Sequence, residues 1–214
     1  MLYPQSEAVA ILRRGPVIPV LTVKDVEDAL VQARALIAGG LTVLEITLRT
    51  PAAMAALTTL ATMFPDAFIG AGTIVTADQI KAAADAGAGF LVSPGMTPRL
   101  LEAAVRSPVP FLPGVATASE ALALRERGFH ALKFFPAESA GGTRYLASLA
   151  GPLPDLIFCP TGGIDAQKAG NYLALPNVAC VGGSWMVAPG LLAARDFGKV
   201  EQLAREAAAL GSRL

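Results

Sequence analysis

The segment VIPVLTVKDVEDALVQARALIAGGLTVLEITL (residues 17–48) carries the pattern that decides the fold. It begins with the apolar run 17–22 and ends with the apolar run 42–48, both nearly uninterrupted, as in parallel strands buried on two faces. Between them, residues 23–40 begin with acidic side chains and end at a Gly-Gly pair, which are the start and stop signals of a helix. The segment therefore predicts a strand–helix–strand unit with parallel strands.

The same unit recurs along the chain, because short apolar runs start 20 to 26 residues apart. The eight runs are 17–22, 42–48, 68–73, 90–95, 110–115, 131–137, 156–163 and 178–184. Helices are expected over 23–40, 76–87 and 117–128, from Asp165 onward, and at the two ends over 5–14 and 197–211. Eight strands at this spacing favour an α/β fold of the (β/α)8 TIM barrel type, with an extra N-terminal helix, over an open doubly wound sheet. No linker or low-complexity tract divides the chain, so we expect a single domain over residues 1–214.

The composition excludes several classes of function. The 214 residues are 53% hydrophobic and include 17 basic and 17 acidic side chains, so neither disorder nor a basic surface for nucleic acid is expected. No uncharged apolar run approaches the ~18 residues of a membrane helix, and the N-terminus lacks the charge order of a secretory signal. We therefore expect a cytoplasmic protein with no nucleic-acid or membrane partner.

Residues that usually bind metals are few. The chain has one histidine, His130, and two cysteines, Cys159 and Cys180, which lie in apolar runs without a metal-binding or redox spacing. We interpret the cysteines as buried thiols in a reducing compartment and His130 as a residue at the edge of a strand. The sequence thus predicts no metal site. It has no Walker A motif, no complete G-x-G-x-x-G and no G-x-S-x-G, so neither nucleotide hydrolysis, a dinucleotide cofactor nor a serine hydrolase is indicated.

Lys133 is the most informative residue. The other four lysines, Lys168 among them, lie in helix-like segments and are expected on solvated faces, whereas Lys133 lies within an apolar strand, HALKFFPA (130–137). A buried ammonium is costly to desolvate and tends to lose its proton, and a neutral amine can attack a ketone to form a Schiff base. The alternative is a structural ion pair with a carboxylate inside the barrel.

Glu45 supplies a carboxylate of the same kind, because it also lies in an apolar strand, TVLEITL (42–48). If both side chains face the barrel interior, Glu45 and Lys133 are either a structural salt bridge or a nucleophile with its proton-transfer partner. Their placement on strands, whose carboxyl ends carry the active sites of such barrels, favours the second. Arg49 follows on the same face as Glu45 and is either a ligand for a substrate carboxylate or a surface arginine.

Two glycine pairs follow neighbouring strands. Gly162–Gly163 ends the seventh apolar run and Gly182–Gly183 the eighth, each before an expected helix start, at Asp165 and near Ser184. Glycine lets backbone N–H groups approach a ligand closely, and a helix N-terminus favours an anion. Because the loops after strands seven and eight are the usual phosphate site of this barrel, the pairs favour phosphate binding over plain turns. The residues together indicate an enzyme that acts on a small phosphorylated keto compound through a lysine imine, without a metal or organic cofactor.

Seven motifs then resemble those of a known family, the 2-keto-3-deoxy-6-phosphogluconate (KDPG) aldolases. These are bacterial class I aldolases of the Entner–Doudoroff pathway and are closely related to 4-hydroxy-2-oxoglutarate (KHG) aldolase. The motifs are GGLTVLEITLRTP (39–51), GAGTIVTADQ (70–79), FLVSPGMTP (90–98), FLPGVATASE (111–120), LKFFPAE (132–138), CPTGGI (159–164) and VGGSW (181–185). They occur in order over about residues 10–190.

The resemblance implies a lyase that cleaves KDPG to pyruvate and glyceraldehyde 3-phosphate, without a cofactor and as a homotrimer. It implies that Lys133 forms the Schiff base and that Glu45 is the general acid/base. The other implied residues contact the substrate: Arg49 and Thr73 its carboxylate, Pro94 the pyruvate pocket, Phe135 the imine, Thr161 the aldehyde half, and Gly162, Gly163 and Ser184 the phosphate.

Two other functions are open. The related 2-keto-3-deoxy-6-phosphogalactonate (KDPGal) aldolase uses the same lysine and glutamate on the C4 epimer, although EITLRTP (45–51) resembles the gluconate type more. Activity on KHG is expected beside the main one, since the pyruvate half is shared. A phosphate-binding barrel without aldol chemistry would explain the glycine pairs but not a lysine and a glutamate on apolar strands.

Overall fold

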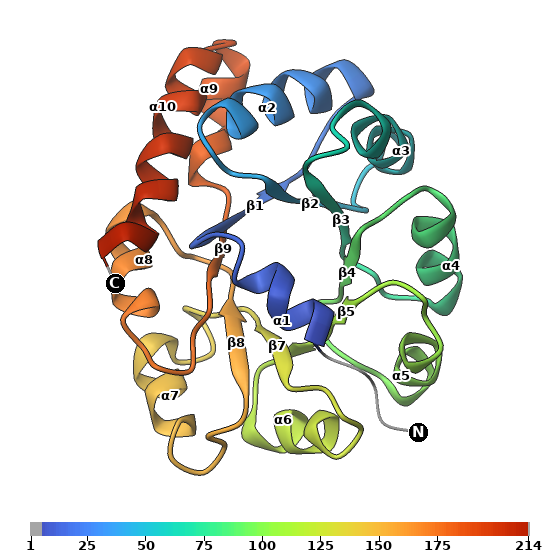
Figure 1. Cartoon of the computed structure of the whole chain (residues 1–214), viewed down its shortest axis with the longest axis vertical. Helices are drawn as coiled ribbons and strands as arrows, with labels where there is room; N and C mark the ends of the chain where they lie inside the picture. The colour runs from blue at the N-terminus through green and yellow to red at the C-terminus, as the bar shows by residue number, and fades with distance from the viewer. Residues whose placement is uncertain (1–5, 214) are drawn as a thin grey trace.

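The computed structural model describes residues 6–213 and shows parallel strands that curl around a centre, with helices on the outside (Figure 1). The strands are β1 (Val17–Leu21), β2 (Val43–Thr47), β3 (Phe68–Gly72), β4 (Phe90–Val92), β5 (Phe111–Leu112), β6 (Gly114–Val115), β7 (Ala131–Phe134), β8 (Ile157–Pro160) and β9 (Val181–Gly183). Each expected apolar run contains at least one of them, so the predicted α/β class is confirmed.

The strands are not joined into one continuous sheet in the part of the chain that the structure describes. Within residues 6–213 the strands form a six-stranded sheet, ordered β5-β4-β3-β2-β1-β9, and a three-stranded sheet, ordered β6-β7-β8. The run 110–115 is divided at Pro113, which has no N–H to donate, so β5 pairs with β4 while β6 pairs with β7. At the other edge, β8 and β9 are connected by the isolated parallel bridges Phe158–Val178 and Thr161–Gly182.

Several of the helices begin at polar caps in the sequence. The helices are α1 (Ser6–Leu12), α2 (Val26–Ala38), α3 (Ala53–Met63), α4 (Ala77–Asp85), α5 (Pro98–Val105), α6 (Ala118–Arg125), α7 (Gly142–Leu149), α8 (Ala166–Leu173), α9 (Pro189–Ala193) and α10 (Phe197–Ala208), with short 3-10 helices η1 (Trp185–Val187) and η2 (Ala209–Arg213). Thr76 and Thr117 form capping boxes with Gln79 and Glu120, which satisfy N–H groups that the helix leaves unpaired. The helices expected over 76–87 and 117–128 are therefore confirmed.

The apolar core has two parts, one between the sheet and the outer helices and one inside the curled sheet. Outward residues such as Leu44 and Leu132 pack under the surrounding helices. Inward residues such as Val43 and Ala131 pack instead against Ile11 of α1, which lies across the middle of the ring in Figure 1. Because Val43 and Ala131 are the first residues of β2 and β7, α1 covers the amino-terminal end of the strands. A functional site is therefore expected at the carboxyl-terminal end of the strands.

The structure also bears on the expectations about membrane helices, metal ions and cysteines. No helix within residues 6–213 is long and apolar enough to cross a membrane. In the same range, no group of three or more His, Cys, Asp or Glu side chains is arranged to hold a metal ion. Cys159 and Cys180 are buried free thiols, as expected, and a hydrogen bond with Cys159, together with burial, raises the pKa of Cys180. The position Gln5 in the expected helix 5–14 lies outside the described residues.

Candidate active site

Lys133 and Glu45 meet inside the curled sheet. Lys133 is on β7 and Glu45 on β2, 88 positions apart in the chain, and Lys133 Nζ lies 3.2 Å from Glu45 Oε1 and 3.5 Å from Oε2. Their side chains are 4% and 5% exposed. Alternation explains the encounter, since Lys133 points the same way as Ala131, and Glu45 the same way as Val43. The structure therefore brings the two predicted groups together in the buried interior of the curled sheet.

Space for this pair comes from glycine on β3. A Cβ on Gly72 would lie within 2.6 Å of Glu45 Cγ and Cδ, and closer still to Oε1. Since Gly72 is aligned with Thr47 on β2, the carboxylate of Glu45 lies over a strand that has no side chain there. The sequence did not predict this close approach, because GAGT (70–73) does not indicate which side chain packs against Gly72.

Arg49 and Thr73 lie together just beyond the ends of β2 and β3. Arg49 Nε donates a hydrogen bond to Thr73 Oγ1 over 3.1 Å. Thr73 has a φ of 62°, a left-handed conformation that costs a β-branched residue free energy, so the surrounding chain holds it in place. Arg49 is exposed. The two residues predicted to bind a carboxylate are thus adjacent.

Phe135, Pro94 and Thr161 each follow a strand of the curled sheet. Lys133 Nζ lies 5.4 Å from the centre of the Phe135 ring. Pro94 follows β4, and its backbone packs so closely on Gly114 that a Cβ there would lie 2.4 Å from the Pro94 carbonyl carbon. Thr161 follows β8, is buried, and forms a bridge with Gly182. All three positions therefore lie at the carboxyl-terminal edge, where the sequence placed them.

The two glycine pairs lie next to each other through the Thr161–Gly182 bridge. Gly162 and Gly163 have φ values of 105° and 77°, which a residue with a side chain adopts only with strain. The loop leads directly into α8, whose N-cap Asp165 accepts hydrogen bonds from Gln167 N and Lys168 N at 3.0 Å. Ser184 is exposed and precedes η1, so the expected helix start near Ser184 is a 3-10 turn.

Glu138, Lys168 and Tyr172 form a cluster behind the Gly162–Gly163 loop that the sequence did not indicate. Lys168 Nζ lies 3.1 Å from Glu138 Oε2 and 2.9 Å from the carbonyl oxygen of Gly163. The Tyr172 hydroxyl donates to Glu138 Oε1 at 2.5 Å. Lys168 is 44% exposed on a helix, in agreement with the expectation of a solvated face, but the sequence did not predict its contacts with Glu138 and Gly163.

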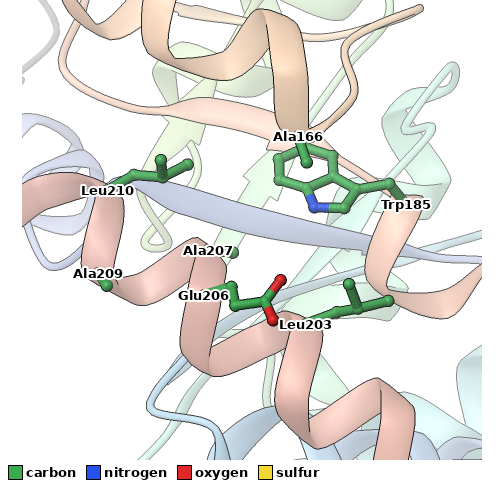
Figure 2. Close-up of a pocket in the computed structure, with 7 residues that line it drawn as sticks. All are labelled: Ala166, Trp185, Leu203, Glu206, Ala207, Ala209 and Leu210. Carbon is green, nitrogen blue, oxygen red and sulfur yellow. The ribbon is translucent and has the colours of Figure 1, made fainter.

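The first of two hollows near these loops lies outside the sheet. It has a volume of about 330 Å³, and Figure 2 shows Trp185 beside Ala166 of α8, with side chains of α10 such as Leu203 across from them. None of the predicted site residues lines it. Trp185 also packs on Gly183, where any Cβ would overlap its ring, so the indole supports the second glycine pair from behind.

The second hollow, of about 480 Å³, borders the predicted site directly. Ser184 lines it from one side and Val20 from another, and Val20 is aligned with Glu45 in the sheet. Gln32 of α2 also lines it and is fully buried, although its amide has no hydrogen-bond partner among residues 6–213. A buried amide inside a helix face of alanines and leucines was not predicted as part of the site.

His130 lies away from these groups. It immediately precedes β7, and its Nδ1 is 3.2 Å from a carboxylate oxygen of Asp155, which precedes β8. Both residues are at the amino-terminal ends of their strands, opposite the Lys133–Glu45 pair. This position agrees with the interpretation of His130 as a residue at a strand edge.

A buried lysine–glutamate pair on parallel strands, with helices outside, defines an α/β enzyme of the lysine-dependent kind. The model of one protein family, described as KDPG and KHG aldolase, matches residues 8–203. The chain belongs to this family, and it is therefore an aldolase and a lyase.

Individual members of the family are similar to this chain over almost its whole length. The KHG/KDPG aldolase of Escherichia coli (strain K12) is 45% identical over 203 residues, which make up 95% of each chain. The solved structure of KDPG aldolase from Legionella pneumophila, with pyruvate captured at low pH as a covalent carbinolamine intermediate, is 46% identical with a TM-score of 0.91, over 94% of this chain and 97% of that one. The structure of the KDPG aldolase of Zymomonas mobilis ZM4 with 3-phosphoglycerate is 43% identical with a TM-score of 0.92, over 97% of both chains.

Proposed function

We propose that this chain is a class I aldolase that cleaves KDPG to pyruvate and glyceraldehyde 3-phosphate. The observation that carries the proposal is the buried contact of Lys133 Nζ with Glu45 at 3.2 Å. An amine and a carboxylate so placed can exchange a proton directly, which gives the neutral amine that attack on a ketone requires. Membership of the aldolase family supports the same chemistry.

The first half of the reaction uses Lys133 as the nucleophile. Glu45 accepts a proton from the lysine, and the neutral amine attacks the C2 carbonyl carbon of the substrate to form a carbinolamine. Loss of water, with a proton returned by Glu45, gives an iminium that can accept an electron pair. The low exposure of both groups strengthens their electrostatic interaction.

The second half breaks the C3–C4 bond. Glu45, as carboxylate, removes the proton of the C4 hydroxyl, the C3–C4 electron pair moves toward the iminium nitrogen, and glyceraldehyde 3-phosphate leaves. The resulting enamine takes a proton at C3, and water then releases pyruvate and regenerates the lysine. Water is released and consumed once each, so the net reaction is cleavage of one substrate into two products. Contact of one carboxylate with the reacting nitrogen suits both proton transfers.

The pyruvate half is assigned to the residues near β2, β3 and β4. Arg49 and Thr73 hold the carboxylate that neighbours the ketone, which their hydrogen bond at 3.1 Å prepares them to do. Pro94 shapes the wall of this pocket. Phe135 lies beside the imine, with its ring 5.4 Å from the lysine nitrogen.

The aldehyde half is assigned to the residues after β8 and β9. Thr161 contacts the C4 region and influences which epimer is accepted. Gly162, Gly163 and Ser184 bind the phosphate, with glycine φ values of 105° and 77° and the N-terminus of α8 nearby in support. Binding of the distant phosphate orients the reacting carbons over Lys133.

The same site serves related substrates. We propose activity on KHG as well, because that substrate shares the pyruvate half that Arg49 and Thr73 would hold. The KDPGal reaction is the second candidate, because it would use the same Lys133–Glu45 pair on the C4 epimer, which Thr161 would contact. Comparison of kcat/KM for KDPG, KDPGal and KHG measures which reaction this chain favours.

The remaining proposals concern the whole molecule. We propose that the two sheets are parts of one (β/α)8 barrel in a single domain over residues 1–214, because the Thr161–Gly182 bridge joins one pair of edges and Pro113 joins the other. The homotrimer and the cytoplasmic location stay predictions. Two buried free thiols support a reducing compartment.

Borohydride trapping tests the function. The protein is incubated with pyruvate and sodium borohydride, and its peptides are analysed by mass spectrometry, with lactate, which has no ketone, in the parallel control. A pyruvate-derived adduct on the Lys133 peptide alone is expected. Folded protein without an adduct would overturn the imine and favour a phosphate-binding barrel without aldol chemistry.

A further inference from the structure

The loop that would bind the phosphate is tied to the turn after β7 by backbone hydrogen bonds. Ala137 N donates to the carbonyl oxygen of Thr161 over 2.8 Å, and Glu138 N donates to that of Gly162 over 3.1 Å. The turn after β7 begins only two residues beyond Lys133. The strand that carries the lysine therefore also supports the neighbouring glycine loop.

Side chains continue this support along α8. Glu138 receives the Tyr172 hydroxyl at 2.5 Å and the Lys168 ammonium at 3.1 Å, and the same ammonium donates to the carbonyl oxygen of Gly163 over 2.9 Å. Tyr172 is only 1% exposed and is anchored among apolar residues. The path from the core to the loop thus runs from Tyr172 through Glu138 and Lys168 to Gly163.

The protonation states of the cluster are well defined near neutral pH. Burial, and then the hydrogen bond to Glu138, raises the pKa of Tyr172, so its hydroxyl stays a donor. The hydrogen bonds from Tyr172 and then Lys168 lower the pKa of Glu138, so it stays a carboxylate. Interaction with Glu138 raises the pKa of Lys168, which stays an ammonium.

The loop fits tightly against this cluster. A Cβ on Gly163 would lie 2.7 Å from Glu138 Cγ, so only glycine fits beside the glutamate at this place. The carbonyl groups of Gly162 and Gly163 are both occupied, by Glu138 N and by Lys168 Nζ. Within residues 6–213 the N–H groups of these two glycines have no acceptor. With its carbonyl groups held from behind, the loop keeps its N–H groups for an anion.

We propose that Glu138, Lys168 and Tyr172 are positioning residues that hold the Gly162–Gly163 loop in the shape that receives the phosphate end of the substrate. The inference rests on the proposed function, which places the phosphate at this loop. Lys168 acts through the loop and not as a free cation, because Glu138 at 3.1 Å and Asp165 at 3.7 Å already balance its charge.

The test compares two aldehydes in the condensation direction, each with pyruvate. Glu138→Gln is expected to raise KM for glyceraldehyde 3-phosphate about tenfold, the size expected from the loss of one charge-assisted hydrogen bond. Its kcat/KM for glyceraldehyde, which lacks the phosphate, and its trapping of pyruvate are expected to stay within about twofold of the original protein. Tyr172→Phe keeps the packing and should change the same parameter in the same direction. A general weakening of the fold would reduce activity on both aldehydes alike.

Asp155→Asn is the matched control. Asp155 and Glu138 are equally exposed, at 35%, but Asp155 pairs with Arg125 and His130 at the opposite end of the strands. This control should leave both KM values unchanged. If Glu138→Gln does not fold, Lys168→Met removes the same link from a side chain that is 44% exposed.

Three results overturn the proposal: equal losses on both aldehydes, no change for the phosphorylated one, or tighter binding of it by Glu138→Gln. The last would show that Lys168 contacts the phosphate directly once released. If the original protein does not trap pyruvate, the proposed function has failed separately. Calorimetry with inorganic phosphate then tests the loop alone, with weaker binding by Glu138→Gln expected and equal binding against the proposal.

Discussion

The two ends of the candidate site are built differently. At the end proposed to bind pyruvate, here called the pyruvate end, the charged side chains of Lys133 and Glu45 project from the middle of strands and touch in an interior where both are about 5% exposed or less. At the end proposed to bind phosphate, here called the phosphate end, the loop of Gly162 and Gly163 offers backbone groups at the surface, while its side-chain support comes from Glu138 behind it. The pyruvate end thus positions two reactive side chains, whereas the phosphate end positions backbone groups through the conformation of a loop.

The difference follows from what each end must do. Proton transfer and attack on a carbonyl need a particular side chain at a particular distance, and a strand buried on both faces gives it little freedom. An anion can be held by several N–H groups, so the backbone conformation matters more than any side chain on the loop. Substitutions at the first end should therefore affect the chemical step, and those at the second end the binding of phosphate.

The largest effect is expected from Lys133→Ala. Without the amine, no Schiff base forms, so pyruvate trapping and aldolase turnover should fall to background. The change also leaves Glu45 without its partner in the interior, a loss that typically costs about 3–5 kcal/mol of stability, so far-UV circular dichroism must show that the protein folds.

Two further variants keep this result interpretable. Lys133→Met retains the aliphatic stem and should be equally inactive. Lys81→Ala removes an exposed lysine on α4 that pairs with Asp85, and its trapping should be unchanged. Substantial turnover by folded Lys133→Ala would show that the chemical end of the site lies elsewhere.

Glu45→Gln comes next in size. The amide keeps the shape but can neither take the proton of the C4 hydroxyl nor exchange a proton with Lys133, so turnover should fall about 10²-fold or more, the usual cost of losing a general acid/base. Imine formation with pyruvate should become slower but still occur, and borohydride trapping measures it beside kcat. Glu102→Gln, which weakens an exposed pair with Arg127, is the control. Unchanged turnover would remove Glu45 from the mechanism.

Gly163→Ala tests the phosphate end alone. The added Cβ meets Glu138 Cγ at 2.7 Å and must adopt a φ of 77°, a conformation that costs about 1–2 kcal/mol for a residue with a side chain. KM for KDPG should rise about tenfold while pyruvate trapping stays unchanged. Gly151→Ala adds a methyl group where no atom lies within 4 Å and should leave both measurements unaltered. Loss of trapping in Gly163→Ala would mean that the two ends are not independent.

The pyruvate end could be anticipated because its residues break a pattern. Lysine and glutamate interrupt apolar strands, and a buried charge needs a partner, so the contact of Lys133 with Glu45 follows from burial and alternation. Helix starts such as Thr76 and Thr117 were predictable for a similar reason, since capping is encoded within four residues.

The support of the phosphate end could not be anticipated. Lys168 and Tyr172 have the spacing of an ordinary amphipathic helix, and Glu138 comes from another segment, so only the folded chain shows that they converge. The division of the run 110–115 could have been predicted from Pro113, because proline cannot donate a hydrogen bond between strands. The run nevertheless resembles a single strand, because its residues are almost all apolar.

The smallest expected effect concerns Gln32, which borders the hollow beside Ser184. Its buried amide has no partner among residues 6–213, so Gln32→Met, which keeps the length of the side chain, should raise the free energy of unfolding in urea by about 1 kcal/mol. If the phosphate end depends on the backbone alone, kcat/KM for KDPG should stay within about twofold. A loss of tenfold or more in kcat/KM, at unchanged stability, would mean that the amide binds the substrate. The phosphate end would then rely on a side chain projecting from a helix, and the contrast between the two ends would be weaker than their glycines suggest.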